Sequence, residues 1–257
     1  MNAAPSSGAI VVKLGGSTLG AHDTSLADIA ALARQGRRVV VVHGGGALTT
    51  EWLERLGVET EFSNGLRKTT AAALDTTIAV LAGVVNKRLV EQFTSLGAQA
   101  LGISGADAGI VRSPLSERGL GFVGEMPVCN AAPLAALLDA GFLPIMAPIG
   151  LSTSDQLINI NADAVAGAVS VALEAEALVM LTDTDGVLDG EQRPIATIDA
   201  EQAEALQAAR VVAGGMLPKL AAGRAAAAGG AAARIVDGRA AGAVPAALRG
   251  ERGTRVL

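Results

Sequence analysis

The chain is 257 residues long, half of its residues are hydrophobic, and its formal net charge is −5. That length suffices for a sizeable core in one large domain or two small ones. The acidic balance argues against nucleic acid as a partner, and no apolar run is long enough to cross a membrane. One cysteine, Cys129, excludes an internal disulfide, and the N-terminus lacks the basic and apolar regions of a secretory signal. We therefore expect a cytoplasmic chain with neither nucleic-acid nor membrane partners.

An apolar run near the N-terminus, residues 10–14, is interrupted by Lys13 and followed by Gly15 and Gly16. Continuous β-branched residues predict a strand buried on both faces of a parallel sheet. Two glycines without Cβ atoms let backbone N–H groups approach an anion closely. The chain has four Lys against sixteen Arg, so a retained lysine indicates a need for a compact, mobile ammonium. This stretch alone leaves open a strand that ends in a solvated lysine and a tight turn.

Apolar runs and helically spaced apolar residues alternate along the rest of the chain. Predicted strands cover residues 39–42, 98–103, 142–147, 177–182, 233–236 and 254–257. Predicted helices cover residues 22–37, 47–56, 71–96, 133–140, 201–209 and a last segment that ends at residue 228. We interpret residues 62–70 as a loop and 112–130 as a hairpin excursion. The alternation predicts an α/β fold with an open, mainly parallel sheet covered on both faces, and no segment has the composition of a linker.

The second strand runs into His43 and then into three glycines that precede a helix. We interpret His43 as a core histidine rather than a ligand. Backbone N–H groups at a helix N-terminus form a ready site for a carboxylate or a phosphate. Within the long helix 71–96, Asn86 and Lys87 are expected to form part of a polar face.

Polar and apolar residues alternate before a helix of small residues. If this segment is extended, Asn159, Asn161 and Asp163 point to the same side. The alternative is an Asn-rich turn that caps the helix, with Asp163 near its positive end. Further on, Lys219 is expected on the first turn of the helix that ends at residue 228. A formal dinucleotide-binding pattern at residues 119–124 is discarded, because no apolar strand precedes it and no helical pattern follows.

Seven short motifs occur in order along the chain. They are Lys13-Leu14-Gly15-Gly16, His43-Gly44-Gly45-Gly46, Gly65-Leu66-Arg67, Val85-Asn86-Lys87, Asn159-Ile160-Asn161-Ala162-Asp163, Thr182-Asp183 with Gly186-Val187-Leu188, and Gly215-Met216-Leu217-Pro218-Lys219. Each is weak alone, but seven in register make the chain resemble the amino-acid kinase family over about residues 9–257. The resemblance implies a three-layer αβα sandwich in a single kinase domain. It also implies an N-terminal lobe, about residues 9–176, for substrate binding and dimerisation, and a C-terminal lobe, about residues 177–257, for ATP.

The resemblance also implies roles for individual residues. Lys13 and Lys219 are similar to the lysines that stabilise the transferring phosphoryl group, and Asp163 to the residue that holds them. Residues implied in substrate binding are Gly44, Gly45, Arg67 and Asn159. Residues implied in ATP binding are Gly15, Gly16, Thr182, Asp183, Gly186, Val187, Leu188, Val211, Val212 and Ala213. No metal is expected on the protein itself, because Mg²⁺ is carried by ATP.

The motifs are most similar to those of family members that phosphorylate the γ-carboxylate of N-acetyl-L-glutamate during arginine synthesis. A carboxylate with a pKa of about 4.3 is ionised at neutral pH and needs no general base to attack phosphorus. The reaction needs charge neutralisation and in-line positioning, which lysines, turn N–H groups and Mg²⁺ supply. Two alternatives stay open: a kinase for carrier-protein-linked aminoadipate or glutamate in lysine synthesis, and a non-catalytic nucleotide or amino-acid sensor. The intact Asn159–Asp163 motif argues against the first, and retention of both Lys13 and Lys219 argues against the second.

Two features bear on the limits of the resemblance. Thr70 stands where the family more often has an acid, so the order of that loop does not follow from the resemblance. About eight residues precede the first predicted strand, whereas arginine-inhibited members of the family are longer there. We therefore expect a homodimer that is insensitive to arginine.

Overall fold

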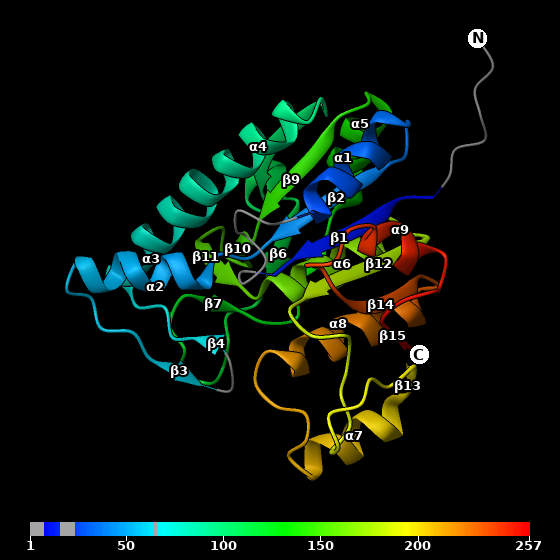
Figure 1. Cartoon of the computed structure of the whole chain (residues 1–257). Coiled ribbons are helices and arrows are strands. Elements are labelled where there is room, and N and C mark those ends of the chain that lie inside the picture. The colour runs from blue at the N-terminus through cyan, green and yellow to red at the C-terminus, as the bar shows by residue number, and fades with distance from the viewer. Residues whose placement is uncertain (1–7, 16–23, 64–65) are drawn as a thin grey trace.

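The computed structural model describes residues 8–15, 24–63 and 66–257 (Figure 1). Some positions used in the sequence analysis lie outside these described residues. They are Gly16, Gly65 and His22, where the first predicted helix begins. In the described ranges no helix is both long and apolar enough to cross a membrane.

The centre of the molecule is one sheet, in which eight strands of the described chain follow the order β13-β15-β14-β12-β1-β2-β9-β5 (Figure 1). The strands are β1 (Ile10–Leu14), β2 (Val39–His43), β5 (Ala100–Ser104), β9 (Leu143–Ala147), β12 (Ala177–Thr182), β13 (Thr197–Ile198), β14 (Ala232–Asp237) and β15 (Thr254–Val256). All neighbouring pairs are parallel except β14 and β15. Val and Ile are abundant in the central strands, because both of their faces are covered.

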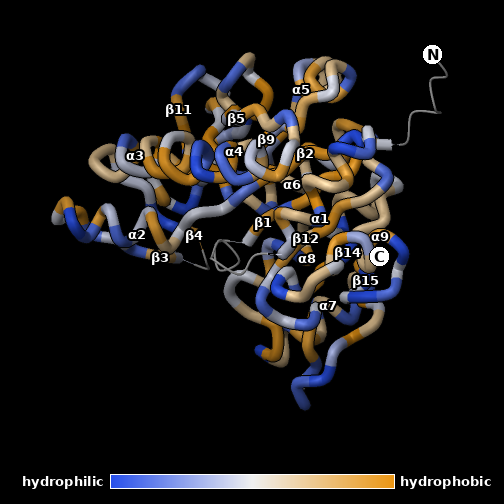
Figure 2. Tube along the Cα trace, turned by 45° about the horizontal axis from the view of Figure 1, so that its top comes forward, coloured by the Kyte–Doolittle hydropathy of each residue, from blue (hydrophilic) through white to orange (hydrophobic). Residues whose placement is uncertain are grey.

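Helices cover both faces of the sheet. One face carries α1 (Ser25–Arg34), α4 (Asn86–Ser95) and α9 (Ala243–Leu248), and the other carries α5 (Ala131–Asp139), α6 (Ala162–Ala172) and α8 (Met216–Ala228). The predicted α/β sandwich of three layers is therefore confirmed. In Figure 2 hydrophilic residues lie along the helix α4 as well as on turns at the rim, some of them near α7 (Ala200–Ala208).

The order of the strands places a switch point at β1. The chain passes from β1 to β2 on one side, whereas β12, reached much later, pairs with β1 on the other side. In open α/β sheets, ligands bind outside the carboxyl ends of the strands at such a switch point. Lys13 near the end of β1 and Thr182 at the end of β12 therefore lie where a site is expected.

The predicted hairpin excursion belongs to a second, smaller sheet. Its five described strands are β7 (Val123–Gly124), β11 (Leu157–Ile160), β10 (Ile149–Ser152), β6 (Val111–Ser113) and β8 (Val128–Cys129), in that spatial order. A 3₁₀ turn, η2 (Asp107–Gly109), precedes β6. The strands β6 and β8 do form an antiparallel pair, but β10 and β11 join them from later in the chain. The excursion is therefore half of a sheet rather than an isolated hairpin.

The prediction that residues 62–70 form a loop is wrong at residues 62–63 and 66–67. Two short strands, β3 (Phe62–Ser63) and β4 (Leu66–Arg67), pair antiparallel below α2 (Gly46–Arg55), as Figure 1 shows. Two residues per strand are too few to show an alternating pattern in the sequence.

The long predicted helix is present but not uniform. It consists of α3 (Ala71–Ile78), a π-helical segment η1 (Ala79–Val85) and α4. The prediction that Asn86 lies on a polar face is wrong, because Asn86 is completely buried, whereas Lys87 is exposed. The wider turns of a π-helix change which face the following residues occupy, and helical spacing in the sequence does not reveal this change.

Candidate active site

Lys13, Asp163 and Lys219 form a buried charged cluster. Lys13 Nζ lies 2.9 Å from Asp163 Oδ1, and Lys219 Nζ lies 3.3 Å from Asp163 Oδ2. The three side chains are 6%, 5% and 12% exposed, respectively. The structure thus brings together the three residues implied in catalysis, although the sequence separates them by up to about two hundred positions.

Three different elements deliver these side chains to one point. Alternation along β1 turns Lys13 to the same side of the sheet as Val11, which packs with α6 and α8. Asp163 lies in the first turn of α6, and Lys219 lies in the first turn of α8. A carboxylate near the N-terminus of a helix is favoured by the helix dipole.

The prediction that Asn159, Asn161 and Asp163 share one side of an extended segment is wrong beyond residue 160. Strand β11 ends at Ile160, and the Asn161 side chain accepts hydrogen bonds from the N–H groups of Asp163 and Ala164. Asn161 is therefore the N-cap of α6, which was the alternative left open by the sequence. The cap fixes the start of the helix and so the position of Asp163.

Burial controls the charge state of the cluster. Burial lowers the pKa of the Lys13 ammonium below its ordinary value of 10.5, the Asp163 carboxylate raises this pKa, and Lys219 lowers it. One carboxylate thus contacts the amino groups of two lysines. Such a cluster can attract and neutralise the oxygens of a phosphoryl group.

A cavity of about 290 Å³ opens beside the cluster. Its lining consists of Lys13, Gly15, Leu181, Thr182, Asp183, Thr184, Gly215, Met216 and Lys219. Gly15, Thr182 and Asp183 are among the residues implied in ATP binding, so the cavity joins them to both lysines. Thr184 lies within the segment 182–188 that the resemblance implies in nucleotide binding, whereas Leu181, Gly215 and Met216 were not assigned a role from the sequence. The sequence signal that could have identified them is that they lie next to Thr182 or near Lys219 in the motifs.

The other described residues implied in ATP binding lie outside this cavity, and Gly16 is not among the described residues. Val187 and Val212 are buried in the core with α8. The Val187 N–H donates to Thr254 Oγ1 at 2.8 Å. Gly186 has a φ of 100°, and a Cβ atom there would lie 2.4 Å from Thr254 Oγ1, so only glycine fits. Val211 is 37% exposed, Ala213 is exposed, and Leu188 is half-buried.

The glycine turn after β2 lies next to the end of β1. The Gly44 N–H donates to the Leu14 carbonyl at 3.1 Å, which occupies one of the two N–H groups implied in substrate binding. Gly45 is the N-cap residue of α2, and this helix has no side-chain cap. The unpaired N–H groups of a helix N-terminus and the helix dipole both favour an anion at such a position.

Arg67 lies beside the same end of α2. Its Nη2 donates to the Gly46 carbonyl at 2.9 Å and to Thr50 Oγ1 at 2.6 Å. Its guanidinium carbon lies 4.5 Å from the centroid of the Phe62 ring. The residue is 8% exposed, and its Nη1 has no hydrogen-bond partner among the described residues. Burial lowers the pKa of Arg67, but an arginine stays charged at neutral pH.

Asn159 and Thr70 border the Arg67 segment. The Asn159 amide donates to Thr69 Oγ1 at 3.1 Å, and its backbone N–H donates to the Phe122 carbonyl at 2.9 Å. The Thr70 side chain accepts from the Ala73 N–H and caps α3. Thr70 therefore orders this loop as an N-cap in place of the acid that is more common in the family.

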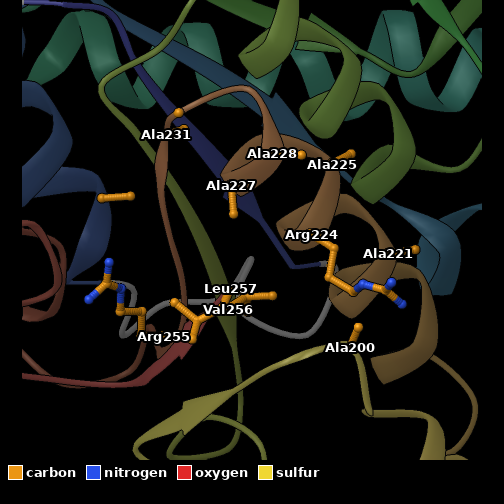
Figure 3. Close-up of a pocket in the computed structure, with 12 residues that line it drawn as sticks. Ala200, Ala221, Arg224, Ala225, Ala227, Ala228, Ala231, Arg255, Val256 and Leu257 are labelled. Carbon is orange, nitrogen blue, oxygen red and sulfur yellow. The ribbon is translucent and has the colours of Figure 1, made fainter. Parts of the chain in front are cut away.

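A larger cavity, of about 860 Å³, lies at the other end of α8 (Figure 3). Its wall is made largely of alanines from α8 and the start of β14, with Leu257 in the middle. Arg224 and Arg255 flank Leu257 and extend in opposite directions (Figure 3). None of the residues implied in binding or catalysis lines it, so size alone does not identify the active site.

Comparison with known proteins agrees with this geometry. A model of the amino acid kinase family matches residues 8–237. The chain is 41% identical over 217 residues to an acetylglutamate kinase of Dehalococcoides mccartyi, a match that covers 82% of this chain and 80% of that one. It is 44% identical over 220 residues to an acetylglutamate kinase of Acaryochloris marina, which covers 82% of this chain and 77% of that one.

A solved structure is similar to nearly the whole of this chain in its fold. N-acetylglutamate synthase of Neisseria gonorrhoeae, complexed with coenzyme A and N-acetyl-glutamate, superimposes with a TM-score of 0.81 at 26% identity. The match covers 97% of this chain and 59% of that one.

Proposed function

Because the chain belongs to the amino acid kinase family, we propose that it transfers the γ-phosphoryl group of MgATP to the γ-carboxylate of N-acetyl-L-glutamate. The product is N-acetyl-L-glutamyl 5-phosphate, an intermediate of arginine biosynthesis. The observation that carries the proposal is the buried cluster of Lys13, Asp163 and Lys219, which lies at the switch point of the sheet. Relatives at 41% and 44% identity named acetylglutamate kinase support the choice of acceptor.

The chemistry fits the residues present. A γ-carboxylate oxygen attacks the γ-phosphorus, the bond from that phosphorus to the oxygen bridging it to the β-phosphate breaks, and ADP leaves with the electron pair. The carboxylate is already ionised at neutral pH, so no side chain has to remove a proton from it. Catalysis then depends on position and on neutralising the charge of the transferring group.

Lys13 and Lys219 supply this neutralisation. Both ammonium groups contact one carboxylate, Asp163, and both line the 290 Å³ cavity. The buried Asp163 carboxylate forms an ion pair with each ammonium group and so holds both at the cavity wall. The donors fit phosphate oxygens, whereas Mg²⁺ prefers oxygen ligands and usually enters such sites on the substrate phosphates. We therefore assign Mg²⁺ to ATP rather than to the protein.

The acceptor is assigned to the side of α2. The unpaired Nη1 of Arg67 and the uncapped N-terminus of α2 both favour an anion, and N-acetylglutamate has two carboxylates and no ammonium. In the proposed pose Arg67 binds the α-carboxylate, Gly45 supplies an N–H near the γ-carboxylate, and Asn159 contacts the acetylamino group. The Gly44 N–H is not used, because it is bonded to Leu14.

The nucleotide is assigned to the opposite side of the lysines. Gly15, Thr182 and Asp183 are proposed to contact the phosphates, and residues Gly186, Val187, Leu188, Val211, Val212 and Ala213 the adenosine part. The proposed lobes, about residues 9–176 and 177–257, then bind acceptor and nucleotide, respectively. We further propose that the protein acts as a homodimer in the cytoplasm, where ATP is available.

An acyl phosphate trap tests the proposal. The full-length protein is incubated with MgATP, hydroxylamine and N-acetyl-L-glutamate, with L-glutamate and L-2-aminoadipate as separate acceptors. Because hydroxylamine converts an acyl phosphate to a hydroxamate, and added ferric chloride turns the hydroxamate into a coloured complex, we expect colour with N-acetyl-L-glutamate that depends on both ATP and Mg²⁺. No hydroxamate with N-acetyl-L-glutamate, at a protein concentration where ATP binds, would contradict the proposal and favour a non-catalytic sensor.

A further inference from the structure

His43 is completely buried at the end of β2, yet the proposed reaction gives it no role. Its Nδ1 lies 2.8 Å from the Gly44 carbonyl oxygen, and its Nε2 lies 3.2 Å from Asn86 Nδ2. A carbonyl oxygen can only accept, so Nδ1 carries the proton. Burial lowers the pKa of His43 to about 4, so the imidazole is neutral at pH 7.

Asn86 fixes which nitrogen of His43 is protonated. The Asn86 Nδ2 lies 2.8 Å from the Ile145 carbonyl and 3.2 Å from the Ile103 carbonyl, so two acceptors identify this atom as the amide nitrogen. An amide nitrogen only donates, and its two hydrogens face three acceptors, so Nε2 of His43 accepts a hydrogen that it shares with a carbonyl. Lys87 Nζ donates to Asn86 Oδ1 at 3.1 Å and completes the arrangement.

The helix that carries Asn86 also packs on the glycine turn. A Cβ atom on Gly45 would lie 2.7 Å from Leu81 Cδ2 and 3.1 Å from Val85 Cγ2, both in the π-helical segment η1. A Cβ atom on Gly102 would lie 2.0 Å from Asn86 Oδ1. The turn and the strand β5 thus pack closely against the segment that carries Asn86.

One peptide unit links His43 to the proposed acceptor site. The Gly44 carbonyl and the Gly45 N–H belong to the same planar unit, and every described peptide bond is trans. In a trans unit the C=O and N–H groups point in opposite directions. When the His43 ring holds the Gly44 oxygen, the Gly45 N–H points away from the ring. That N–H has no hydrogen-bond partner among the described residues.

We propose that His43 and Asn86 are positioning residues that direct the Gly45 N–H at the acceptor. Asn86 selects the tautomer of His43, His43 holds the Gly44 carbonyl, and the carbonyl sets the direction of the N–H. A peptide between two glycines otherwise rotates easily, because neither residue has a Cβ atom to restrict it. In the reversed orientation a carbonyl oxygen would face the anionic carboxylate and repel it. This inference rests on the proposed function, which places the γ-carboxylate near Gly45.

A matched pair of substitutions tests it. The amide nitrogen of asparagine can occupy the place of Nδ1, whereas that of glutamine reaches the place of Nε2. His43→Asn therefore keeps a donor for the Gly44 carbonyl, and His43→Gln loses it while keeping a buried amide. Leu89→Val is the control, because it loosens the packing of α4 three positions from Asn86 without touching the hydrogen bonds.

We expect His43→Gln to lower kcat for N-acetyl-L-glutamate at least about tenfold. Complete loss of an oxyanion donor lowers kcat roughly 10²–10³-fold, and this variant misdirects the donor without removing it. His43→Asn should stay within about threefold of the natural chain, and KM for MgATP should not change in any variant. Equal losses in the two variants, no loss in either, or a loss that Leu89→Val reproduces would overturn the proposal. If the natural chain forms no hydroxamate, the proposed function is wrong, and the positioning of an acceptor by His43 is then wrong as well.

A spectroscopic readout does not depend on activity or on the folding of a variant. The chain has two histidines, His22 and His43, so a ¹⁵N-histidine spectrum of the natural chain contains two sets of ring signals. His22→Gln assigns them. We expect His43 to carry its proton on Nδ1 and to stay neutral from pH 6 to pH 8. A proton on Nε2, or titration in that range, would overturn the proposed chain of hydrogen bonds.

Discussion

At the Lys13–Asp163–Lys219 cluster two ammonium groups share one carboxylate, whereas beside α2 the Arg67 guanidinium is held by neutral groups alone. The lysine charges are partly compensated before any ligand arrives. Among the described residues no carboxylate pairs with the buried Arg67 guanidinium, and its Nη1 has no hydrogen-bond partner. A buried charge that lacks a counter-ion favours a permanently anionic ligand. We therefore expect Arg67 to act on acceptor binding and the lysines to act on charge that appears during transfer.

The largest expected effect is on the lysine side. Lys219→Ala should lower kcat by about 10²-fold or more and change KM for N-acetyl-L-glutamate little, because Lys219 neutralises charge mainly in the transition state. Arg224→Ala, on the same helix with a 42% exposed side chain, is the matched control and should leave kcat unchanged. Because Lys13 acts on the same group, losses in the Lys13→Ala, Lys219→Ala double variant should not add. An unchanged kcat in Lys219→Ala would remove this residue from the mechanism.

The acceptor site beside Arg67 should favour an acceptor without an ammonium group. Free glutamate brings an ammonium to a region that already holds the uncompensated Arg67, whereas N-acetylglutamate brings a neutral amide. We expect kcat/KM for N-acetyl-L-glutamate to exceed that for L-glutamate at least about 10²-fold, as when a polar site is mispaired. Steady-state rates with both acceptors at fixed MgATP measure the ratio. Comparable values for the two would show that the charge of Arg67 does not select the acceptor.

Replacing the guanidinium should have a smaller effect on the same side. Arg67→Lys should raise KM for N-acetyl-L-glutamate about tenfold or more, because a lysine offers a point charge and cannot make two parallel hydrogen bonds. Arg55→Lys on the neighbouring α2, where the side chain is 69% exposed, is the control and should have no effect. If Arg67→Lys instead raises KM for MgATP, the acceptor is assigned to the wrong side.

Phe62 should contribute less than Arg67 itself. Its ring lies against the guanidinium at 4.5 Å, and an exposed cation–π contact is worth about 0.5–1 kcal/mol. Phe62→Leu should therefore raise KM for N-acetyl-L-glutamate about two- to fivefold, while Phe142→Leu, an exposed phenylalanine elsewhere, should not. Equal effects of the two substitutions would mean that the ring does not orient Arg67.

Loss of the Lys13 proton should limit activity at alkaline pH. Burial lowers the pKa of Lys13 below 10.5, so kcat/KM for MgATP should fall on the alkaline side as this ammonium loses its proton. The Asp163 carboxylate raises that pKa, so in Asp163→Asn the alkaline fall should begin at a lower pH. A fall that stays in place, or moves to higher pH, would show that another group titrates.

Sequence reasoning identified the residues of the cluster but not their mutual geometry. Lys13 and Lys219 were recognisable from their rarity and their motifs, and parallel strands bring the end of β1 next to the end of β12 wherever this fold forms. Asn86 was misjudged, because a π-helical segment changes the face on which it lies, and no residue pattern marks that change. The contact of Phe62 with Arg67 also escaped prediction, because the two residues pair across β3 and β4, two strands of two residues each.

Calorimetric titration of Arg67→Lys with each ligand separately tests the division between the two regions most directly. Full-length natural chain and variant are titrated with N-acetyl-L-glutamate and with the non-hydrolysable analogue AMP-PNP in the presence of Mg²⁺. The account predicts that the variant binds N-acetyl-L-glutamate about tenfold more weakly and AMP-PNP as the natural chain does. Weaker binding of AMP-PNP with unchanged binding of N-acetyl-L-glutamate would contradict it and place Arg67 on the nucleotide side.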